Sequence, residues 1–562
     1  MTPRIDLSAT LRELADLAAI RGASSDAECL DHAAAAIAGL GEDAFSTVAR
    51  LARRNRLSEL PGISPSLHDE IRHLLKAGRK HALGAALARV PRLIHRLLDL
   101  SALSSQDARR LVRDLEVATL SDLQSALDDG RLGQHTDAVT ARKLKAASEA
   151  LALDGLPLTL GRACELLESL LPAIAEACPH LEGIEPSGDV RRFEPAIRDL
   201  VLVGRASDPE AALDSLCAVP VLDDVLCRGA RRAIVLYRGV EVDVRIPDAS
   251  EFGSLLFTTT GSRAHVTVVA RRSGPAPERT EERVYAQAGL PYIPPELRQG
   301  AGEIEAAGAR QLPILLERRD IRGDLHMHTS YSDGRDSLEA MVAACLAMGH
   351  EYIAITDHSQ GAAASRTLKA GDILRQRAEI DRMRELYPSI SILHGIEVDI
   401  RPDGRLDFGD SVLEQFDVVL ASLHDRAGQD GPRLTARCLQ AMRHPLVTIL
   451  AHPSNRLVGR SPGYPLDFET IYAAAAETST ALEIDGAPGH LDLEGSRARE
   501  AARAGATIVV NSDSHRATSL DRQMRFGVGT ARRGWIERRH VLNTRPLSDV
   551  LGFITAKRAG SR

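Results

Sequence analysis

Residues 323–334 of the chain read GDLHMHTSYSDG. His326 and His328 are two residues apart, and in an extended segment this spacing places both imidazoles on the same face. After Ile321, short apolar runs alternate with helical stretches, and the runs are YIAIT, SILHGIEVDI, DVVLASLH, LVTILAH, TALEID and TIVVNSD. This alternation predicts a parallel βα barrel or a related α/β fold.

Histidine and carboxylate side chains stand at the ends of these predicted strands. His326 and His328 end the first strand, and the side chains that follow are Asp333, His358, Glu397, His424, His452, Asp513 and His515. Barrels of this type build their sites at the C-terminal ends of the strands. Imidazoles combined with carboxylates suit Zn, Mn or Fe, so the pattern predicts two or three divalent ions. Such ions acidify water and stabilise a phosphoryl transition state, which points to phosphoester hydrolysis.

The motifs GDLHMHTSYSDG, AITDHS, GIEVDI, ASLHD, LAHPSNRLVGR and NSDSH resemble those of the PHP (polymerase and histidinol phosphatase) family. The resemblance implies a distorted (βα)7 barrel with a trinuclear metal site. It places His326, His328, Glu397 and Asp513 around one metal. It makes Glu397 a bridge to a second metal held with His424 and His452. It assigns Asp333, His358 and His515 to a third. The residues expected to be catalytic are Glu397, Asp513 and His424.

Two arginines follow His452 in the segment HPSNRLVGR. Guanidinium donors match phosphate oxygens in pairs, so Arg456 and Arg460 are candidates for binding substrate phosphate. The alternative is a surface loop with ordinary arginines. Asp357 precedes His358, and we expect it to orient that ligand rather than act as a general base.

The composition describes a multidomain globular protein. A length of 562 residues predicts three to five domains, and 44% hydrophobic with 26% charged residues is ordinary for such proteins. The formal net charge of −7 does not indicate nucleic-acid binding, so any DNA contact must come from local patches. One Trp, eight Tyr and nine Phe argue against a base-stacking platform.

Cysteine usage and the N-terminal segment indicate the compartment. The seven cysteines show no CxxC spacing and are odd in number, which predicts a reduced protein without a disulfide-linked partner. The N-terminal segment lacks a long apolar region, and no run reaches the length of a membrane span. We therefore expect a cytoplasmic protein with no membrane association.

The N-terminal half contains two kinds of sequence pattern. Residues 8–150 are rich in Ala and Leu at helical spacing, whereas DLVLVGR, RAIVLYRGVEVDVRI and HVTVVARR are β-like runs. The predicted domains are a helical domain with a helix-hairpin-helix over 1–85, a helical fingers-like domain over 86–155, a palm and thumb over 156–275, a linker over 276–320 and the PHP domain over 321–562. The predicted fold class is therefore an all-α N-terminal region, an α+β palm and thumb, and an α/β barrel.

A second resemblance covers the middle of the chain. SGDVRRFEPAIRDLVLV resembles the G-S-x-R-R…D-x-D palm motif of family X DNA polymerases, and EVDVRI around Asp243 resembles the strand with their third aspartate. GSR at 261–263, followed by Ala264 and His265, resembles their F-T-G-S-K-A-H segment. LPYIPPELR and RRGWIERRHVLNTRPL look like bacterial PolX chains, in which such a core precedes a PHP domain.

The palm departs from the polymerase pattern. Nucleotidyl transfer needs three carboxylates around two Mg ions. Counted from the arginine pair, the first falls on Asp199 and the third on Asp243, but Val201 replaces the second. Pro186 before Ser187 is interpreted as replacing the glycine of the phosphate-binding turn. The interpretation is a palm that does not hold Mg for catalysis and does not polymerise.

Two helix-hairpin-helix elements are indicated. LPGISPSLHDEI at 60–71 keeps the Pro-Gly turn but has Ser64 in place of a second glycine, and Pro61, Gly62 and Ile63 are candidate DNA contacts. In the second element Ser101-Ala102-Leu103-Ser104 replaces the turn, which suggests a structural role. The alternative for the whole helical region is a packing or oligomerisation domain.

Three functions are consistent with these features. The first is a metal-dependent phosphodiester hydrolase acting on DNA ends or gaps in repair, as a 3′–5′ exonuclease or 3′-end-processing enzyme with an inactive polymerase module. The second is a working gap-filling polymerase with an auxiliary PHP exonuclease. The third is a DNA-repair scaffold whose metal site only stabilises the fold.

Overall fold

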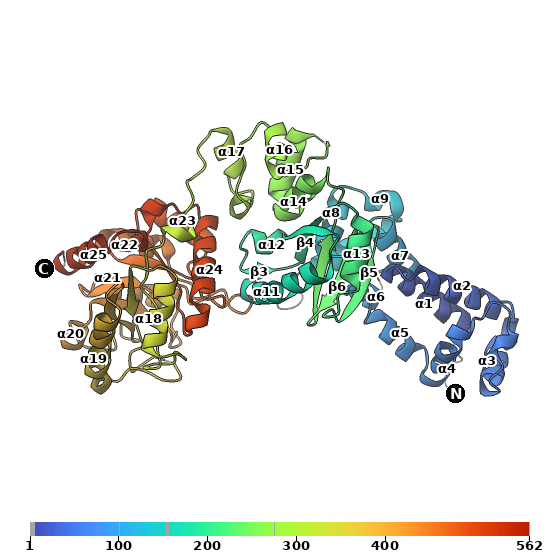
Figure 1. Ribbon diagram of the computed structural model, residues 1–562, viewed down its shortest axis with the longest axis horizontal. Helices are drawn as coiled ribbons and strands as arrows, with labels where there is room; N and C mark the ends of the chain where they lie inside the picture. The colour runs from blue at the N-terminus through green and yellow to red at the C-terminus, as the bar shows by residue number, and fades with distance from the viewer. Residues whose placement is uncertain (1–5, 101, 153–156, 275, 363, 561–562) are drawn as a thin grey trace.

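The computed structural model describes residues 6–100, 102–152, 157–274, 276–362 and 364–560. A helical arm, a palm built on a sheet, a small helical thumb and a C-terminal barrel follow one another along an elongated molecule (Figure 1). This arrangement confirms the predicted fold class. The predicted boundary residues 155, 156 and 275 lie outside the described residues, so the domain limits stay predictions.

The arm consists of helices joined by short turns. Its helices are α1 Leu7–Arg21, α2 Ser24–Ala38, α3 Ala44–Arg53, α4 His68–Ala77, α5 Arg79–Leu87, α6 Arg92–Asp99, α7 Ser105–Arg113, α8 Leu120–Asp128, α9 Leu132–His135 and α10 Ala138–Ala152, with 3-10 turns η1 Gly41–Asp43, η2 Leu57–Glu59 and η3 Pro65–Leu67. One apolar core lies among α1 to α5, and a second extends onto Leu226, Cys227 and Ile234 of the palm. Burial of this shared apolar surface stabilises the contact between arm and palm.

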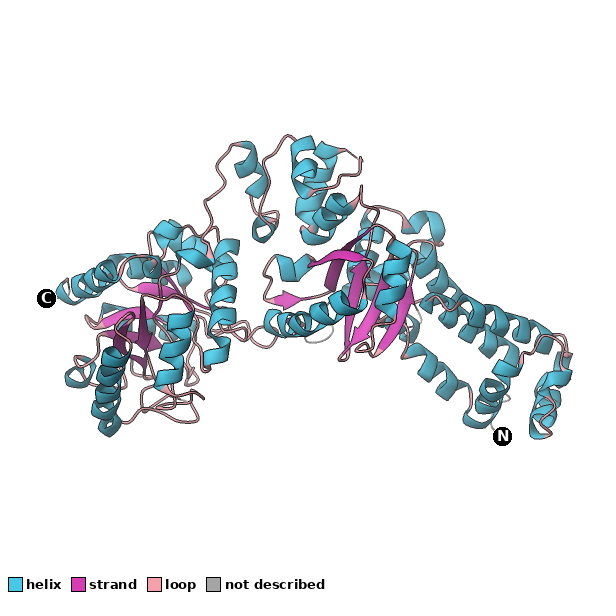
Figure 2. Cartoon of the chain, in the orientation of Figure 1, coloured by secondary structure: helices cyan, strands magenta, loops and turns pink. Residues whose placement is uncertain are grey.

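The palm is a five-stranded sheet. Its elements are β1 Leu158–Thr159, α11 Leu160–Ala177, β2 Leu181–Pro186, α12 Gly188–Arg191, β3 Ala196–Ile197, β4 Leu200–Ala206, α13 Pro209–Cys217, β5 Asp224–Arg228, β6 Arg232–Tyr237 and β7 Val240–Arg245. The strand order is β2-β4-β7-β6-β5, and the central strands β4 and β7 are parallel (Figure 2). Their register places Val201 opposite Asp243, so the two predicted palm-site positions lie on neighbouring strands.

One prediction for the thumb region is wrong. The run HVTVVARR is not a strand but part of helix α15 Arg263–Ser273, because the Ser262 side chain caps the helix and the apolar side chains recur at helical spacing. The predicted linker contains α16 Glu281–Gln287, η4 Pro295–Leu297 and α17 Glu303–Gly308. These elements share a core with α14 Phe252–Thr260 and α15.

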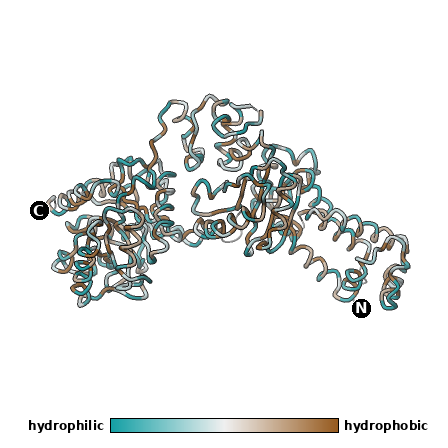
Figure 3. Tube along the Cα trace, viewed as in Figure 1, coloured by the Kyte–Doolittle hydropathy of each residue, from teal (hydrophilic) through white to brown (hydrophobic). Residues whose placement is uncertain are grey.

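The barrel contains seven parallel strands. They are β8 Gly323–Asp324, β9 Tyr352–Ile355, β10 Ser391–Asp399, β11 Val418–Ser422, β12 Val447–Leu450, β13 Ala481–Asp485 and β14 Ile508–Asn511, in sequential order around the sheet. A bridge between Met327 and Ser514 brings the first and last strands together at one end. The strand interiors are apolar in Figure 3, as expected when helices cover a parallel sheet.

Helices surround these strands. They are α18 Leu338–Ala347, α19 Ala370–Leu386, α20 Asp410–Leu413, α21 Gly431–Arg443, α22 Phe468–Thr478, α23 Gly495–Arg503, α24 Leu520–Arg533 and α25 Leu547–Ala559, with 3-10 turns η5 Arg318–Asp320, η6 Ala517–Ser519, η7 Arg538–His540 and η8 Leu542–Thr544. Within the described ranges, no helix has the length and apolar character needed to cross a membrane.

Helix α24 joins the barrel to the palm. Glu168 of α11 forms ion pairs with Arg522 and Arg525, and Arg533 pairs with Glu194. A side chain at Gly529 would collide with the Phe193 ring, since a Cβ there would lie 2.0 Å from it. The palm therefore packs directly against the barrel rather than hanging from a linker (Figure 1).

Candidate metal centre

The nine side chains predicted as metal ligands meet at the C-terminal mouth of the barrel. Residues 326–328 form an extended segment, in which the carbonyl of Met327 accepts from Thr356 and that of His326 accepts from Asp513. This pairing on both edges holds the two imidazoles on one face. Together the nine residues make up four overlapping groups whose ligand atoms lie within 4.8 Å of one another.

Glu397 lies at the centre of the cluster. Its Oε1 is 2.9 Å from His452 Nε2 and 3.3 Å from His424 Nε2. Its Oε2 is 2.6 Å from His358 Nδ1, 3.5 Å from His326 Nε2 and 3.6 Å from His328 Nε2. Two ligands that each lie about 2.1 Å from a shared ion are about 3.0–3.4 Å apart. The separation from His424 falls in this range, and those from His452 and His326 lie within about 0.1 Å of it, which suits a bridging carboxylate.

A second carboxylate, Asp513, faces the first two histidines. Its Oδ1 is 3.0 Å from His328 Nε2 and 3.5 Å from His326 Nε2. Its backbone φ is +49°, and that of His452 is +25°, which are uncommon values for residues with a side chain. Such conformations persist where the surrounding structure holds them, and they are frequent at functional sites.

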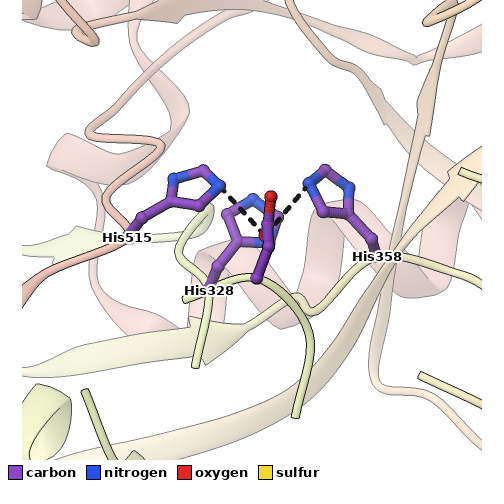
Figure 4. Close-up of side chains that lie close together, drawn as sticks. His328, His358 and His515 are labelled. Carbon is purple, nitrogen blue, oxygen red and sulfur yellow. Dashed lines mark ion pairs between the residues drawn. The ribbon is translucent and has the colours of Figure 1, made fainter. Parts of the chain in front are cut away.

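A third carboxylate, Asp333, completes the cluster on the side nearest β8 and β9. Figure 4 shows the rings of His328, His358 and His515 converging, and the ion pairs from His358 and His515 run to Asp333 Oδ1 at 3.5 and 3.2 Å. The His328 ring stacks between the other two, with centroids 4.2 and 4.3 Å away. The structure therefore assembles the set predicted around a third metal, and adds His328 to it.

Several ligand atoms have no hydrogen-bond partner in the described part of the chain. These buried atoms are His328 Nδ1, Asp333 Oδ1, His358 Nδ1, Glu397 Oε2 and His452 Nδ1. Asp333 Oδ1, His358 Nδ1 and Glu397 Oε2 have only the ion pairs described above. Buried polar atoms are costly unless they are well paired, so bound cations would stabilise this cluster. Divalent ions bound by nitrogen and carboxylate ligands fit this donor set, with Zn, Mn and Fe favoured over Mg.

Neighbouring charges shift the pKa values of the ligands. Burial disfavours charge on His326, but Glu483, Asp513 and Glu397 raise its pKa well above the usual value. Burial likewise opposes ionisation of Glu397, yet the surrounding His358, His424 and His326 hold its pKa well below the usual value. The pKa of His328 moves the other way, to about 3, because burial and the neighbouring His358 and His515 disfavour its charge. Metal ligands must be deprotonated, so metal binding at His326 is expected to release a proton.

Two further carboxylates orient the ligands and were not singled out from the sequence. Glu483 Oε1 accepts from His326 Nδ1 at 2.8 Å, and its Oε2 accepts from the His452 backbone at 2.9 Å. Asp399 Oδ1 lies 2.5 Å from His424 Nδ1. Such partners fix the ring orientation of metal-binding histidines. The available signal was a Glu inside the apolar strand TALEID and an Asp two residues after Glu397.

Asp357 holds the loop that carries Asp333. Its carboxylate accepts from the backbone and hydroxyl groups of Thr329 and Ser332, and from Gln376 Nε2. Every contact of this buried carboxylate is therefore to loop or helix rather than to the open mouth. None of these contacts is to His358, so the predicted orientation of that ligand by Asp357 stays a prediction.

The two candidate phosphate-binding arginines differ. Arg456 donates through Nε to His490 O, through Nη1 to Glu494 and through Nη2 to Leu491 O, so each of its nitrogens is already engaged. Arg460 is exposed and forms no ion pair within the described residues. It borders a cavity of about 480 Å³, which is also lined by Pro195 and Ala196 of the palm. Of the two, the structure leaves only Arg460 available for phosphate.

The carboxylates of the palm site are already bound by neighbouring side chains. Asp243 accepts from Arg232 Nε at 2.8 Å and from Arg245 Nη2 at 2.7 Å. Both arginines also bind Asp122 of α8. Asp199 accepts a hydrogen bond from the Ser121 hydroxyl, and burial raises its pKa to about 6 although that bond opposes the shift. Val201 is buried opposite Asp243 and offers no ligand.

The interpretation of Pro186 is wrong. Pro186 is the last residue of β2 and pairs with Leu202. The glycine of the turn is Gly188, with φ of +63°, three residues before Arg191. The residue that departs from the G-S-x-R-R pattern is Asp189, whose carboxylate pairs with Arg192 and accepts from the Arg198 backbone. A carboxylate therefore stands where the motif has a hydroxyl, and it repels a triphosphate.

Replacing Arg232 tests whether this ion-pair cluster closes the palm. We expect Arg232→Ala to weaken the attachment of α8 to the palm by about 3 kcal/mol, because it leaves Asp122 and Asp243 short of a buried partner. Amide hydrogen exchange over 116–128 should accelerate roughly a hundredfold. Arg231→Ala, at an exposed neighbouring position, is the matched control. Unchanged exchange in Arg232→Ala would show that the cluster does not hold α8.

The first hairpin turn lies at the surface of the arm, and the second is packed. Pro61 and Gly62 are exposed, and Gly62 has φ of +85°, whereas the Ile63 side chain is buried and its backbone N–H donates to Leu60 O at 3.3 Å. In the second element Ala102 and Leu103 are buried and Ser104 caps α7. Ser101 lies outside the described residues.

Comparison with known proteins gives two levels of similarity. Residues 324–476 match the PHP domain family. The DNA polymerase/3′-5′ exonuclease PolX of Bacillus subtilis is 31% identical over 531 residues, which cover 90% of this chain and 92% of that protein. A probable phosphatase of Shewanella oneidensis is 33% identical over 207 residues, covering 35% of this chain and 77% of that protein.

A solved structure is similar to part of the chain. The crystal structure of histidinol phosphate phosphatase from Lactococcus lactis, complexed with zinc, L-histidinol and phosphate, is 20% identical. It covers 38% of this chain and 94% of that one, with a TM-score of 0.31.

Proposed function

The chain belongs to the PolX family, and from that premise we propose that its barrel hydrolyses phosphodiester bonds in DNA from the 3′ end, while its palm no longer polymerises. The assembly of nine ligand side chains at the barrel mouth, in groups whose ligand atoms lie within 4.8 Å of one another, is the observation that carries the first part. The engagement of Asp243 by two arginines carries the second. The DNA substrate is inferred from the Bacillus relative, which is a DNA polymerase/3′-5′ exonuclease.

The proposed ligand sets are those that the PHP resemblance implies. In the structure the close groups around Glu397 are His326 with His452, and His358 with His424. His326, His328, Glu397 and Asp513 would hold one ion, and Glu397 with His424 and His452 a second. Asp333, His358 and His515 would hold a third. Bound divalent ions, Mn, Zn or Fe, would supply positive charge against phosphoryl oxygens and lower the pKa of water.

The chain's own residues position these ligands and the substrate. Glu483 and Asp399 fix the rings of His326 and His424. His424 is 20% exposed at the mouth, so we propose that it contacts substrate in addition to binding metal. Arg460 is proposed to bind a phosphate of the DNA, because its guanidinium has no ion-pair partner among the described residues and matches phosphate geometry. As part of the same proposal, the protein acts on DNA ends or gaps in the cytoplasm.

A ladder assay tests the proposed polarity. A 5′-labelled oligonucleotide, incubated with the full chain and Mn, Zn or Mg in turn, should give labelled products shortened one nucleotide at a time, and EDTA should prevent this. Release of a labelled mononucleotide as the first product would indicate attack from the 5′ end and would contradict the proposal.

Removing the N-terminal domains tests their positioning role. The segment 318–562 contains every proposed ligand, and we expect it to hydrolyse bis-p-nitrophenyl phosphate at a rate similar to the full chain. Its kcat/KM on DNA should fall at least about tenfold, because contacts that position the duplex are lost. Equal DNA cleavage by both forms, measured in parallel, would mean that arm and palm do not position the substrate.

A further inference from the structure

Three exposed arginines lie on the loops around one side of the barrel mouth. We call Arg335, Arg366 and Arg516 the arginine rim. Arg335 comes two residues after Asp333, and its backbone donates to His515 O at 2.8 Å. Arg516 directly follows His515. Both are thus carried by segments that also carry proposed metal ligands.

Arg366 reaches the same place from a different loop. Its Nη2 donates to Gly334 O at 3.0 Å. Gly334 itself is pressed against His328, because a Cβ there would lie 2.6 Å from the His328 carbonyl carbon. The guanidinium of Arg366 is therefore held within one residue of Asp333. Loops after β8, β9 and β14 contribute one rim arginine each.

The rim arginines are not neutralised by the chain. None of the three forms an ion pair within the described residues, although nearby Arg375, Arg384 and Arg405 pair with Asp372, Asp381 and Asp403. Two nearby carboxylates bind backbone groups instead: Asp336, in the loop after β8, accepts from Ala517, and Asp407, in the loop after β10, accepts from Gly361. A protein with net charge −7 thus keeps three free positive charges beside this site.

Exposed guanidinium groups without a carboxylate partner among the described residues suit the phosphates of a strand. Arginine binds phosphate oxygens in pairs and remains charged at all physiological pH values. A small phosphate ester reaches the metal ligands without needing charges outside them, whereas a strand presents further phosphates to the loops. The rim lies on the half of the mouth formed by β8, β9 and β14. The opposite half, at β11 and β12, carries Arg460 and faces the palm.

We propose that the arginine rim binds the phosphates that neighbour the hydrolysed phosphodiester in the same nucleic-acid strand, so that the strand extends from the metal centre over the β8, β9 and β14 loops. This inference rests on the proposed hydrolytic function and adds the side on which the strand lies and the residues that hold it. The rim is expected to favour hydrolysis of a strand over hydrolysis of a small phosphate ester.

The test is a comparison of two substrates with the full chain. In the variant Arg335→Gln/Arg366→Gln/Arg516→Gln, kcat/KM for a 5′-labelled 12-nucleotide strand should fall at least tenfold relative to kcat/KM for bis-p-nitrophenyl phosphate. The dependence of log kcat/KM on log salt should become shallower by about 2, since each lost phosphate contact contributes roughly 0.7 on single strands. An equal fall for both substrates, or no fall for either, overturns the inference.

A control variant carries the same change of charge at the other end of the barrel. Arg443, Arg503 and Arg538 are exposed, and they lie near the N-terminal ends of β12 and β14. Their replacement by Gln should leave both substrates unaffected. A tenfold loss on the strand in this control would assign the effect to overall charge and overturn the inference.

A binding measurement separates failure of the rim from failure of the proposed function. If the unmodified chain hydrolyses neither substrate with Mn, Zn or Mg, the proposed function is wrong. Anisotropy of a fluorescein-labelled 12-nucleotide strand in EDTA then decides the inference. Affinity reduced at least threefold in the rim variant and unchanged in the control supports it, whereas equal affinities overturn it.

Discussion

Glu397→Gln should abolish hydrolysis of both DNA and bis-p-nitrophenyl phosphate, with kcat falling about a thousandfold or more. The carboxylate lies 2.6–3.6 Å from five imidazole nitrogens and is the proposed bridge between ions. Loss of that bridge removes several kcal/mol of transition-state stabilisation, which corresponds to a change of this size. Metal analysis of the purified variant should show at least one ion fewer per chain.

A matched substitution controls for folding. Glu469→Gln makes the same chemical change on the exposed surface of α22 and should leave activity and metal content unchanged. Circular dichroism should be the same for both variants. Hydrolysis by Glu397→Gln at the rate of the unmodified chain, with contaminating nuclease excluded, would remove Glu397 from the proposed centre.

No primer extension is expected from this chain, with Mg or with Mn. Val201 supplies no carboxylate, Asp243 is held by Arg232 and Arg245, and Asp189 places a negative charge at the turn before Arg191. Without the full set of carboxylates, the primer 3′-hydroxyl lacks the metal that lowers its pKa. Val201→Asp alone should not restore extension, because the arginines and Asp189 remain.

The measurement is extension of a primer across a one-nucleotide gap. It should be made in the Glu397→Gln background, so that degradation does not mask synthesis. Template-dependent incorporation by the protein with Val201 in place would contradict this account of the palm and favour a gap-filling polymerase with an auxiliary exonuclease.

The barrel was predictable because its pattern is local. Each predicted strand is a short apolar run with a His, Asp or Glu at its end. Because the C-terminal ends of parallel strands meet at one face of a barrel, this pattern places these side chains together. The spacing of His326 and His328 is enough to place both rings together. Glu483 and Asp399 were not predictable as partners, because which imidazole a buried carboxylate meets depends on packing between separate strands.

The palm and thumb were harder to predict for physical reasons. In HVTVVARR the β-branched residues favour a strand, but the Ser262 cap and the buried faces of His265 and Val269 favour a helix, and the tertiary contacts decide. The turn glycine was assigned to the wrong position because Ser187 lies directly between Pro186 and Gly188, so the sequence alone leaves the start of the turn open. Only the backbone conformation at Gly188 shows where the turn begins.

The positions of bound ions test the central claim most directly. Crystals of the full chain grown with Mn should be measured at the Mn absorption edge. The account predicts at least two anomalous peaks at the barrel mouth, one of them between Glu397 and the imidazoles of His424 and His452. An empty mouth in crystals of a preparation that hydrolyses DNA with Mn would contradict it.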